Sequence, residues 1–509
     1  MNHLTHINLQ FIFLTTIFLA LINVLMMVEP QNVQEFSTPC KDCNIVFIDI
    51  DTLRADAIDC QNNFDNTPNL CKLLQSSIVF KNNISQSIMT RASFVSTLTS
   101  LYPNSHNNLN ETYGNPDPEI ITLPKYLNNL GYQSIYVGSF ASGQILYDDF
   151  KRVHKTEYLD FDHKVFTSQK QPFFLYLYSA AMHLPYYPYK EKKGGGSDNI
   201  KAPEEMPLTR SDFNQVLADY LIEHYKGIFT PAARSSKPEI FGGDIQKKKN
   251  QLLEYYFQLD SSPEIKTHYL NKRWAPWYQS YIQFIDPNNP NDVRYLKSRY
   301  LDCLYAIDDS LGKIFKTLEE NSLTDKTIIV LESDHGEEFY EHGLFSHANA
   351  PYEELIHTPL AIKIPNVKHR EIQNQTQNID IFPTLTEILG TGSSPQFEGR
   401  SLLPLIKDQT YTQDDTYQIS QWELDYSASF RKGEWKLILL ERKPTQLYNL
   451  SKDPQEQNNL IEEEKSVTQN LFEEYKKIVS NYRIYKENRL PLLDLTPERR
   501  QQLIKEGYF

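Results

Sequence analysis

Two short apolar runs constrain the fold of this chain most, because each is typical of a buried β-strand that ends in acidic residues. Residues 44–50 (NIVFIDI) are rich in β-branched and aromatic side chains and run directly into Asp51. Residues 327–331 (TIIVL) are followed by an acidic stretch that contains Asp334 and His335. Carboxylates at the C-terminal ends of such strands lie where α/β sheets place their ligands. The chain is therefore predicted to form an α/β fold with an acidic site.

The acidic strand ends predict a metal site. An adjacent Asp334 and His335, followed by a glycine that lets the backbone turn closely, can present a carboxylate oxygen and an imidazole nitrogen to one divalent ion. Asp51 is the candidate ligand from the first strand, with a helix N-cap as the alternative interpretation. We expect at least one of the histidines in the following aromatic stretch to be functional. These histidines are His342, His347 and His357.

A nucleophile candidate lies in residues 85–94 (SQSIMTRASF). Ser87, Thr90 and Arg91 place two hydroxyls and a cation ahead of a segment that can continue as a helix. At a helix start, backbone N–H groups and a guanidinium can hold an anion against an attacking oxygen. The alternative interpretation of Ser87 is a helix N-cap, where serine is common.

A single histidine follows another predicted strand. Residues 172–179 (PFFLYLYS) form this strand, and His183 comes shortly after it, ahead of Leu184 and Pro185. A lone histidine is usually structural, but one at a strand end before a proline is held rigidly and exposed. Both interpretations of His183 therefore stay open.

The composition indicates a folded protein with one large core and a smaller one. The chain has 509 residues, of which 40% are hydrophobic. Its net charge of −14 argues against a nucleic-acid partner, because phosphate contacts require concentrated lysine and arginine. An anionic substrate would need a local positive site, from a metal or from a few placed cations.

Residues 1–30 are predicted to be a signal peptide or an N-terminal membrane anchor. Residues 11–28 form an uncharged apolar run that exceeds an ordinary signal core and approaches the length of a membrane span. The residues before it contain no lysine or arginine, and no clear cleavage site follows it. The protein is thus expected to be exported and to be periplasmic, secreted or membrane-anchored.

The five cysteines leave at least one unpaired if all pairing is intramolecular, and we do not expect them to form a disulfide framework. Cys40 and Cys43 have C-x-x-C spacing, but no second pair lies at the distance of a zinc site. A local disulfide or two inert thiols is therefore expected there instead of a metal.

The chain is predicted to divide into a catalytic domain at residues 43–395, a C-terminal subdomain at residues 396–482 and a tail at residues 483–509. An insertion at about residues 187–292 begins with a glycine-rich loop and continues with aromatic and polar residues. It is expected either to recognise the organic part of a substrate or to be a packing subdomain. The C-terminal subdomain is expected to contain antiparallel strands at 435–440 and 446–450 and a charged helix at 467–479.

In their order along the chain, these motifs resemble the sulfatase family of the alkaline phosphatase superfamily across most of residues 44–460. The matching stretches are NIVFIDIDTLRAD, SIMTRASFVSTLTSLYP, MHLPY, SDHGEEFYEHG, YEELIHTPLAIKIP, NIDIFPTLTEILG, FEGRSLLPLI and LYNLSKDPQEQNNL. The resemblance implies an α/β fold with a large central, mostly parallel sheet flanked by helices, and a smaller C-terminal α+β subdomain. It also implies a metal-dependent hydrolase of sulfuric esters.

The resemblance assigns metal ligands to four residues and implies one divalent ion, with calcium preferred over manganese, magnesium or zinc. The four are Asp51, Ser87, Asp334 and His335. It also assigns catalytic roles, in which one hydroxyl attacks, a cation steadies it, and two histidines touch the sulfate or protonate the leaving oxygen. These residues are Ser87, Arg91, His183 and His347.

The chain departs from the family pattern at three places. In sulfatases the nucleophile is a formylglycine made from cysteine or serine, and Met89 stands where the modifying machinery reads proline or alanine, which argues against conversion of Ser87. The paired aspartates of many members are Asp51 and Thr52 here. Residues 138–141 (GSFA) replace a Gly-Lys-x-His segment, so a lysine and a histidine that would contact the anion are missing.

Three functions follow from this pattern. The first is hydrolysis of sulfuric ester bonds in a sulfated small molecule or glycan. The second is a phosphodiesterase or phosphoryl-group transferase that uses unmodified Ser87, because phosphate chemistry tolerates an alkoxide nucleophile. The third is a non-catalytic protein that binds an anionic glycan, against which the complete set of Asp51, Asp334, His335 and Arg91 argues.

Overall fold

The structure is a computed structural model, and it describes residues 40–62, 65–107, 116–138, 149–155, 159, 172–187, 201–203, 206, 209–224, 281–347, 350–408, 411, 416–422 and 427–485. The predicted N-terminal segment 1–30, most of the predicted insertion and all but the first residues of the predicted tail lie outside these ranges. Within them, no helix has the length and hydropathy that crossing a bilayer requires. The account below concerns the compact unit formed by Cys40–Phe509.

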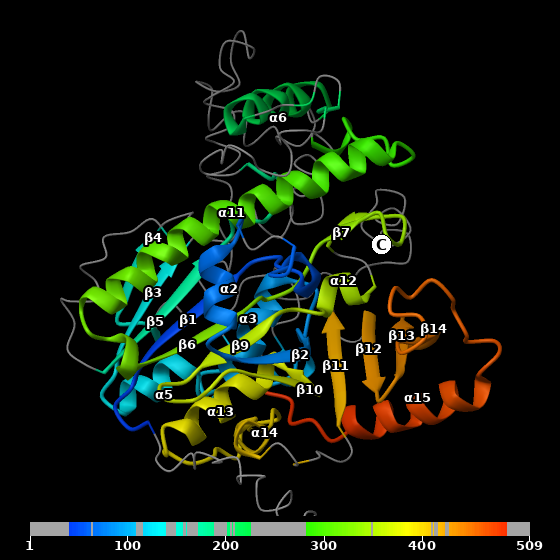
Figure 1. The fold of residues 1–509 in the computed structure, drawn as a ribbon. Helices are drawn as coiled ribbons and strands as arrows, with labels where there is room; N and C mark the ends of the chain where they lie inside the picture. Colours follow the sequence, from blue (N-terminus) through cyan, green and yellow to red (C-terminus); the bar gives the residue numbers. More distant parts are fainter. Residues whose placement is uncertain are drawn as a thin grey trace, which may run out of the picture. The chain divides into compact units, whose positions relative to one another are not determined.

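An eight-stranded sheet forms the centre of the unit, with the strand order β10-β2-β9-β6-β1-β5-β3-β4 (Figure 1). Its strands are β1 (Asn44–Ile50), β2 (Ile78–Ile84), β3 (Gln133–Gly138), β4 (Arg152–Lys155), β5 (Phe173–Ser179), β6 (Thr327–Glu332), β9 (Leu360–Lys363) and β10 (Arg370–Gln377). β9 runs antiparallel to β2 and β6, and the other neighbouring strands are parallel. The predicted large, mostly parallel sheet is thereby confirmed.

Helices and short elements connect these strands. Among the described residues, the α-helices are α2 (Pro68–Leu74), α3 (Thr90–Thr99), α4 (Pro103–His106), α5 (Leu123–Asn129), α6 (Arg210–His224), α11 (Pro290–Glu320), α12 (Glu353–Ile356), α13 (Ile381–Ile388), α14 (Leu403–Lys407) and α15 (Lys465–Val479). Short 3₁₀ turns lie at η1 (Ala55–Ala57), η6 (Thr324–Lys326) and η7 (Asn378–Asp380), and β7 (Glu338–Phe339) pairs with β8 (Phe345–Ser346).

The central strand β1 explains where the functional site lies. All seven of its residues are buried, as expected for a parallel strand covered on both faces. On one face, Val46 and Ile48 belong to the same core as Leu304 of α11. On the other face, Phe47 stacks on Tyr176 of β5, which in turn meets α3. Because alternate residues share a face, the acidic residues that follow Phe47 at every second position face α3.

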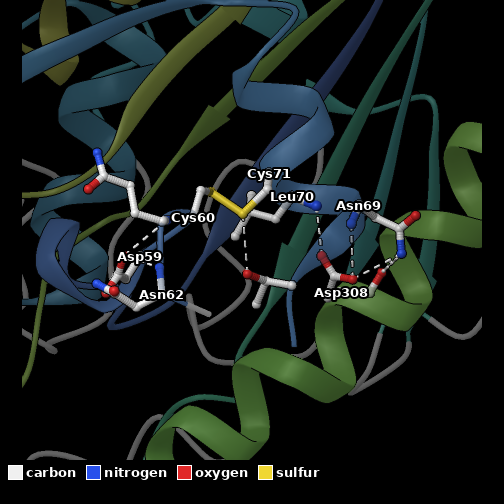
Figure 2. The surroundings of a disulfide bond; sticks show 9 residues. Asp59, Cys60, Asn62, Asn69, Leu70, Cys71 and Asp308 are labelled. Atoms are coloured by element: carbon white, nitrogen blue, oxygen red, sulfur yellow. Dashed lines mark hydrogen bonds between the residues drawn. A yellow bond between two sulfur atoms is a disulfide. The ribbon is translucent and has the colours of Figure 1, made fainter. Parts of the chain in front are cut away.

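Helix α11 begins at Pro290 and extends over 31 residues to Glu320. Proline is favourable in the first turn of a helix, because the backbone N–H groups there have no partner within the helix. The side chain of Asn289, the N-cap residue, accepts a hydrogen bond from Asn291 N. Farther along, Asp308 accepts hydrogen bonds from the first backbone N–H groups of α2 (Figure 2). This contact joins α2 to α11 beside the sheet.

The cysteines form two disulfides. The predicted local disulfide between Cys40 and Cys43 is confirmed, and Cys303 is buried and belongs to neither disulfide. A second bridge, Cys60–Cys71, was not predicted and ties the segment after β1 to α2 (Figure 2). The spacing of these two cysteines did not reveal the bridge, because their proximity depends on how α2 packs against the sheet.

A second, antiparallel sheet follows the central one in the chain (Figure 1). It contains β11 (Tyr417–Trp422), β12 (Ser427–Lys432), β13 (Trp435–Leu440) and β14 (Lys443–Asn449), with α15 packed against it. The predicted C-terminal strands and helix are confirmed, while the domain boundaries stay predictions. This sheet reaches the predicted nucleophile segment, because Gln421 N donates to Gln86 O at 2.8 Å and Trp422 packs with Ile84 and Ile88.

Candidate active site

The two acidic strand ends meet in space. β1 and β6 are adjacent and parallel, with Asp49 opposite Glu332, so their C-terminal ends coincide. Asp51, Asp334 and His335 each offer one ligand atom there, and these atoms lie within 4.8 Å of one another. His335 Nε2 lies 3.7 Å from Asp51 Oδ1 and 3.6 Å from Asp334 Oδ2. We call these three residues the strand-end cluster.

In each aspartate of the strand-end cluster, one carboxylate oxygen accepts hydrogen bonds from the protein and the other has no hydrogen bond. Tyr178 OH donates to Asp51 Oδ2 at 2.6 Å, and the backbone N–H groups of His335 and Thr52 donate to Asp334 Oδ1 at 2.8 and 3.2 Å. Asp51 Oδ1 and Asp334 Oδ2 are buried and have no hydrogen-bond partner. A buried acceptor without a partner is unfavourable by about 1–3 kcal/mol or more when charged. Two carboxylate oxygens and an imidazole nitrogen fit a divalent ion.

Two more acids lie next to the cluster and were not predicted. Asp49 and Glu332 are fully buried, and burial together with the charges of neighbouring acids raises the pKa of both. Burial and the charge of Asp334 likewise raise the pKa of Asp51. Strand alternation could have found Asp49, because residues two apart in a strand share a face. This concentration of negative charge favours a bound cation.

His335 presents a lone pair to the acids. Its Nδ1 lies 2.8 Å from Gly336 O, and a carbonyl oxygen only accepts, so Nδ1 carries the proton. Nε2 is then the acceptor nitrogen that faces the strand-end cluster. Burial lowers the pKa of His335, which keeps the imidazole neutral and suited to bind a metal.

The structure brings His183 and His347 beside the strand-end cluster. The ring centroid of His347 lies 4.3 Å from that of His335 and 5.0 Å from that of His183. His347 Nδ1 lies 2.9 Å from Glu337 Oε1, and Tyr186 OH donates to Glu337 Oε2 at 2.8 Å. Burial lowers the pKa of both His183 and His347 to about 4. Glu337, which was not predicted, fixes the orientation of the His347 ring.

The predicted nucleophile segment lies at the start of α3. This helix begins at Thr90 with Met89 as its N-cap, so the alternative interpretation of Ser87 as the helix N-cap is wrong. Arg91 lies in the first turn and is buried. The hydrogen bonds of Ser87 remain within residues 85–89, where Met89 N donates to Ser87 Oγ at 3.3 Å. Thr90 Oγ1 instead lies 3.2 Å from His335 Nε2.

The two remaining histidines of the predicted aromatic stretch lie elsewhere. His357 Nε2 lies 2.8 Å from the carbonyl oxygen of Lys81, in an exposed contact. His342 Nε2 lies 3.3 Å from Glu354 Oε1, and together with Glu456 these residues form a second group of ligand atoms within 4.8 Å. We call His342, Glu354 and Glu456 the C-terminal cluster.

The fold is an α/β fold whose mostly parallel sheet ends in a buried cluster of carboxylates and an imidazole. Comparison with protein families assigns the chain to a family. The family model described as Sulfatase matches residues 43–391, and the model described as N-sulphoglucosamine sulphohydrolase, C-terminal, matches residues 340–483. The chain therefore belongs to the sulfatase family, within the alkaline phosphatase superfamily.

Individual relatives cover different shares of the chain. Arylsulfatase K of Mus musculus is 29% identical over 204 residues, which is 37% of this chain and 37% of the mouse protein. N-acetylglucosamine-6-O-sulfatase of Bacteroides thetaiotaomicron is 24% identical over 483 residues, 82% of each chain. The structure of BT4656 in complex with its substrate D-glucosamine-2-N,6-O-disulfate has a TM-score of 0.61 and 19% identity, covering 87% of this chain and 99% of that one. This last likeness shows a shared fold.

Proposed function

We propose that this chain is a metal-dependent hydrolase of sulfuric esters and that its substrates are sulfated glycans. The observation that carries the proposal is the pair of buried carboxylate oxygens without hydrogen bonds beside a neutral imidazole, in a chain of the sulfatase family. The relative that acts on N-acetylglucosamine-6-O-sulfate and the fold shared with a protein that binds a glucosamine disulfate support a sulfated sugar as the substrate.

Asp51, Asp334 and His335 would hold the divalent ion, and Ser87 stays a predicted fourth ligand. Calcium is preferred because oxygen donors predominate. When bound, the ion would polarise a sulfate oxygen and lower the pKa of the attacking hydroxyl. Manganese, magnesium and zinc are the alternatives, since an imidazole ligand suits several of them.

The other residues act on the sulfate group and on the leaving oxygen. Ser87 is proposed as the nucleophile and Arg91 as the cation that steadies it. His183 and His347 are neutral near pH 7, because burial lowers the pKa of each to about 4. The Nδ1 atoms of these rings contact Leu184 O (His183, 2.8 Å) and Glu337 Oε1 (His347, 2.9 Å), so the neutral rings offer Nε2 as a proton acceptor. Either ring could protonate the leaving oxygen after it has taken up a proton. Glu337 holds His347 in one orientation for this task.

The chemical state of Ser87 separates this function from a second candidate. A formylglycine made from Ser87 would release its sulfate through the hemiacetal, whereas a sulfate ester on serine lacks that route. Met89 argues against the conversion. An unmodified Ser87 would suit a phosphodiesterase or phosphoryl-group transferase, which is therefore our second candidate.

Peptide mass spectrometry and turnover assays test the two candidates together. The protein is purified from its native host, the peptide that contains Ser87 is analysed, and the turnover of an aryl sulfate and an aryl phosphodiester is measured with Ca²⁺. Formylglycine with sulfate turnover that Ser87→Ala abolishes supports the sulfatase. An unmodified serine with phosphodiester turnover supports the second candidate. Binding of a sulfated glycan without turnover of either compound would contradict both and favour a binding protein.

We also propose that the protein is exported. The disulfides Cys40–Cys43 and Cys60–Cys71 support export, because such bonds persist in oxidising compartments. Cell fractionation with N-terminal sequencing tests this. A mature N-terminus after residue 28 indicates a cleaved signal, and an intact N-terminus in the membrane fraction indicates an anchor. A cytoplasmic protein with reduced thiols would contradict export.

A further inference from the structure

The position of Thr90 extends the strand-end cluster by one oxygen. His335 Nε2, the acceptor nitrogen of the ring, has three oxygens around it. Two are the carboxylate oxygens without hydrogen bonds, Asp51 Oδ1 at 3.7 Å and Asp334 Oδ2 at 3.6 Å. The third is Thr90 Oγ1, at 3.2 Å. The hydroxyl oxygen thus lies as near to Nε2 as the two carboxylate oxygens do.

These separations suit donors that share one ion. With metal–donor distances of about 2.0–2.6 Å and right angles between bonds, neighbouring donors lie about 2.8–3.7 Å apart. All three oxygens lie within or at the edge of this interval from Nε2. Without an ion, the Thr90 hydroxyl can donate its proton to the Nε2 lone pair. With an ion bound to Nε2, the lone pairs of the hydroxyl oxygen are available to bind the same ion.

The start of α3 holds Thr90 in this place. Thr90 is the first residue of the helix, and Ser93 N donates to Met89 O at 3.1 Å to close the first turn. Ser87 precedes the helix, and its hydroxyl accepts from Met89 N. The segment therefore turns the Thr90 hydroxyl toward the cluster while the Ser87 hydroxyl is hydrogen-bonded within the segment.

We propose that the Thr90 hydroxyl is a further ligand of the divalent ion, in addition to Asp51, Asp334 and His335. This inference rests on the proposed function, because it concerns the same metal site. It assigns a binding role to the residue three positions after Ser87 and leaves the attacking role with Ser87.

Calorimetry of Ca²⁺ binding to the metal-free full-length protein tests the role, with Mn²⁺ as a second probe. Thr90→Val removes the hydroxyl at nearly constant volume, and we expect the Kd for Ca²⁺ to rise at least about tenfold, the lower end of what even indirect partners of a metal contribute. Thr90→Ser keeps the oxygen and should stay close to the wild-type Kd. Thr90→Ala is measured in parallel, so that misfolding of one variant does not decide the result.

The matched control is Thr97→Val. Thr97 lies on the same helix, is also buried, and has a hydroxyl without a hydrogen-bond partner, so the same substitution there should leave the Kd unchanged. If Thr90→Val or Thr90→Ala has the wild-type Kd while Asp334→Asn weakens binding, the role of Thr90 is refuted. The proposed metal site would stand in that case. If the wild-type protein bound neither ion, or if Asp334→Asn bound both normally, the metal site and the role of Thr90 would fall together.

Discussion

The part of the chain that the structure describes contains two clusters of a histidine and two carboxylates. One lies at the ends of β1 and β6, and the other lies where α12 meets the C-terminal part of the chain. In both, the ligand atoms lie within 4.8 Å of one another. They differ in the source of positive charge. Among the ion pairs of the described residues, those of Asp51 and Asp334 involve only His335.

The C-terminal cluster has a cation of its own. Lys436 is fully buried, and its Nζ lies 2.8 Å from Glu456 Oε1 and 2.8 Å from Glu353 Oε1. An ammonium group there balances the acids and would repel a metal ion. The composition of a cluster therefore does not distinguish a metal site from an internal ion pair, and the charge balance of its surroundings does.

The largest expected effect comes from Asp334→Asn in the strand-end cluster. Turnover with Ca²⁺ should fall at least about 10³-fold, a loss of about 4 kcal/mol of transition-state stabilisation. The metal-free variant should unfold at a higher temperature than the metal-free wild type, because one of several mutually repelling buried acids is removed. Turnover assays and thermal unfolding in a chelator measure both effects. Unchanged turnover and Ca²⁺ affinity would refute the metal assignment.

Removing the cation of the other cluster should have the opposite effect on stability. Lys436→Met leaves Glu353 and Glu456 without their buried partner, and the free energy of unfolding should fall by about 3–5 kcal/mol. Denaturant unfolding measures this change, while the Ca²⁺ affinity of the folded variant should match wild type. The matched control is Lys476→Met, because Lys476 pairs with Glu473 at the same 2.8 Å but on the surface, with 48% of its side chain exposed. Equal effects of both substitutions would contradict the comparison.

The pH dependence of Glu353 provides a third test. Burial raises the pKa of Glu353, but Lys436 and Arg431 lower it more, to about 2. Since this pKa is below the ordinary glutamate value of 4.5, the carboxylate stabilises the fold above pH 4.5 and loses this contribution as the pH falls toward about 2. Glu353→Gln should therefore lower the free energy of unfolding by about 2 kcal/mol at pH 7 and by less at pH 3. Equal effects at both pH values would argue against the ion pair.

The smallest effect is expected for His342→Gln. The imidazole is partly exposed, contacts Glu354 and stacks on the ring of Tyr352. Glutamine keeps part of both contacts, so the free energy of unfolding should change by about 1 kcal/mol. The Ca²⁺ affinity should not change. A loss of Ca²⁺ affinity in this variant would show that the C-terminal cluster also binds metal, and the difference between the two clusters would disappear.

Much of the fold was predictable from local patterns. The runs at 44–50 and 327–331 are β1 and part of β6, because continuous apolar sequence with β-branched residues favours a strand buried on both faces. The sequence predicted one site for Asp51, Asp334 and His335, because all three follow the C-terminal end of a strand. The antiparallel direction of β9 had no local signal, since it depends on a strand distant in sequence. The Cys60–Cys71 bridge joins cysteines only 11 residues apart, but their spacing alone does not specify how α2 is placed.

The sequence by itself determined which chemical groups stand at the strand ends, because a strand's pattern specifies its own burial and the residue that follows it. Only the tertiary structure decided which groups meet. Whether the hydroxyl of Ser87 or that of Thr90 faces His335 depends on where α3 begins and how it packs on β1. Whether an acidic cluster needs an external ion depends on a lysine from another part of the chain, as Lys436 shows. Charge balance in a buried site is a property of all segments around it, and no single segment encodes it.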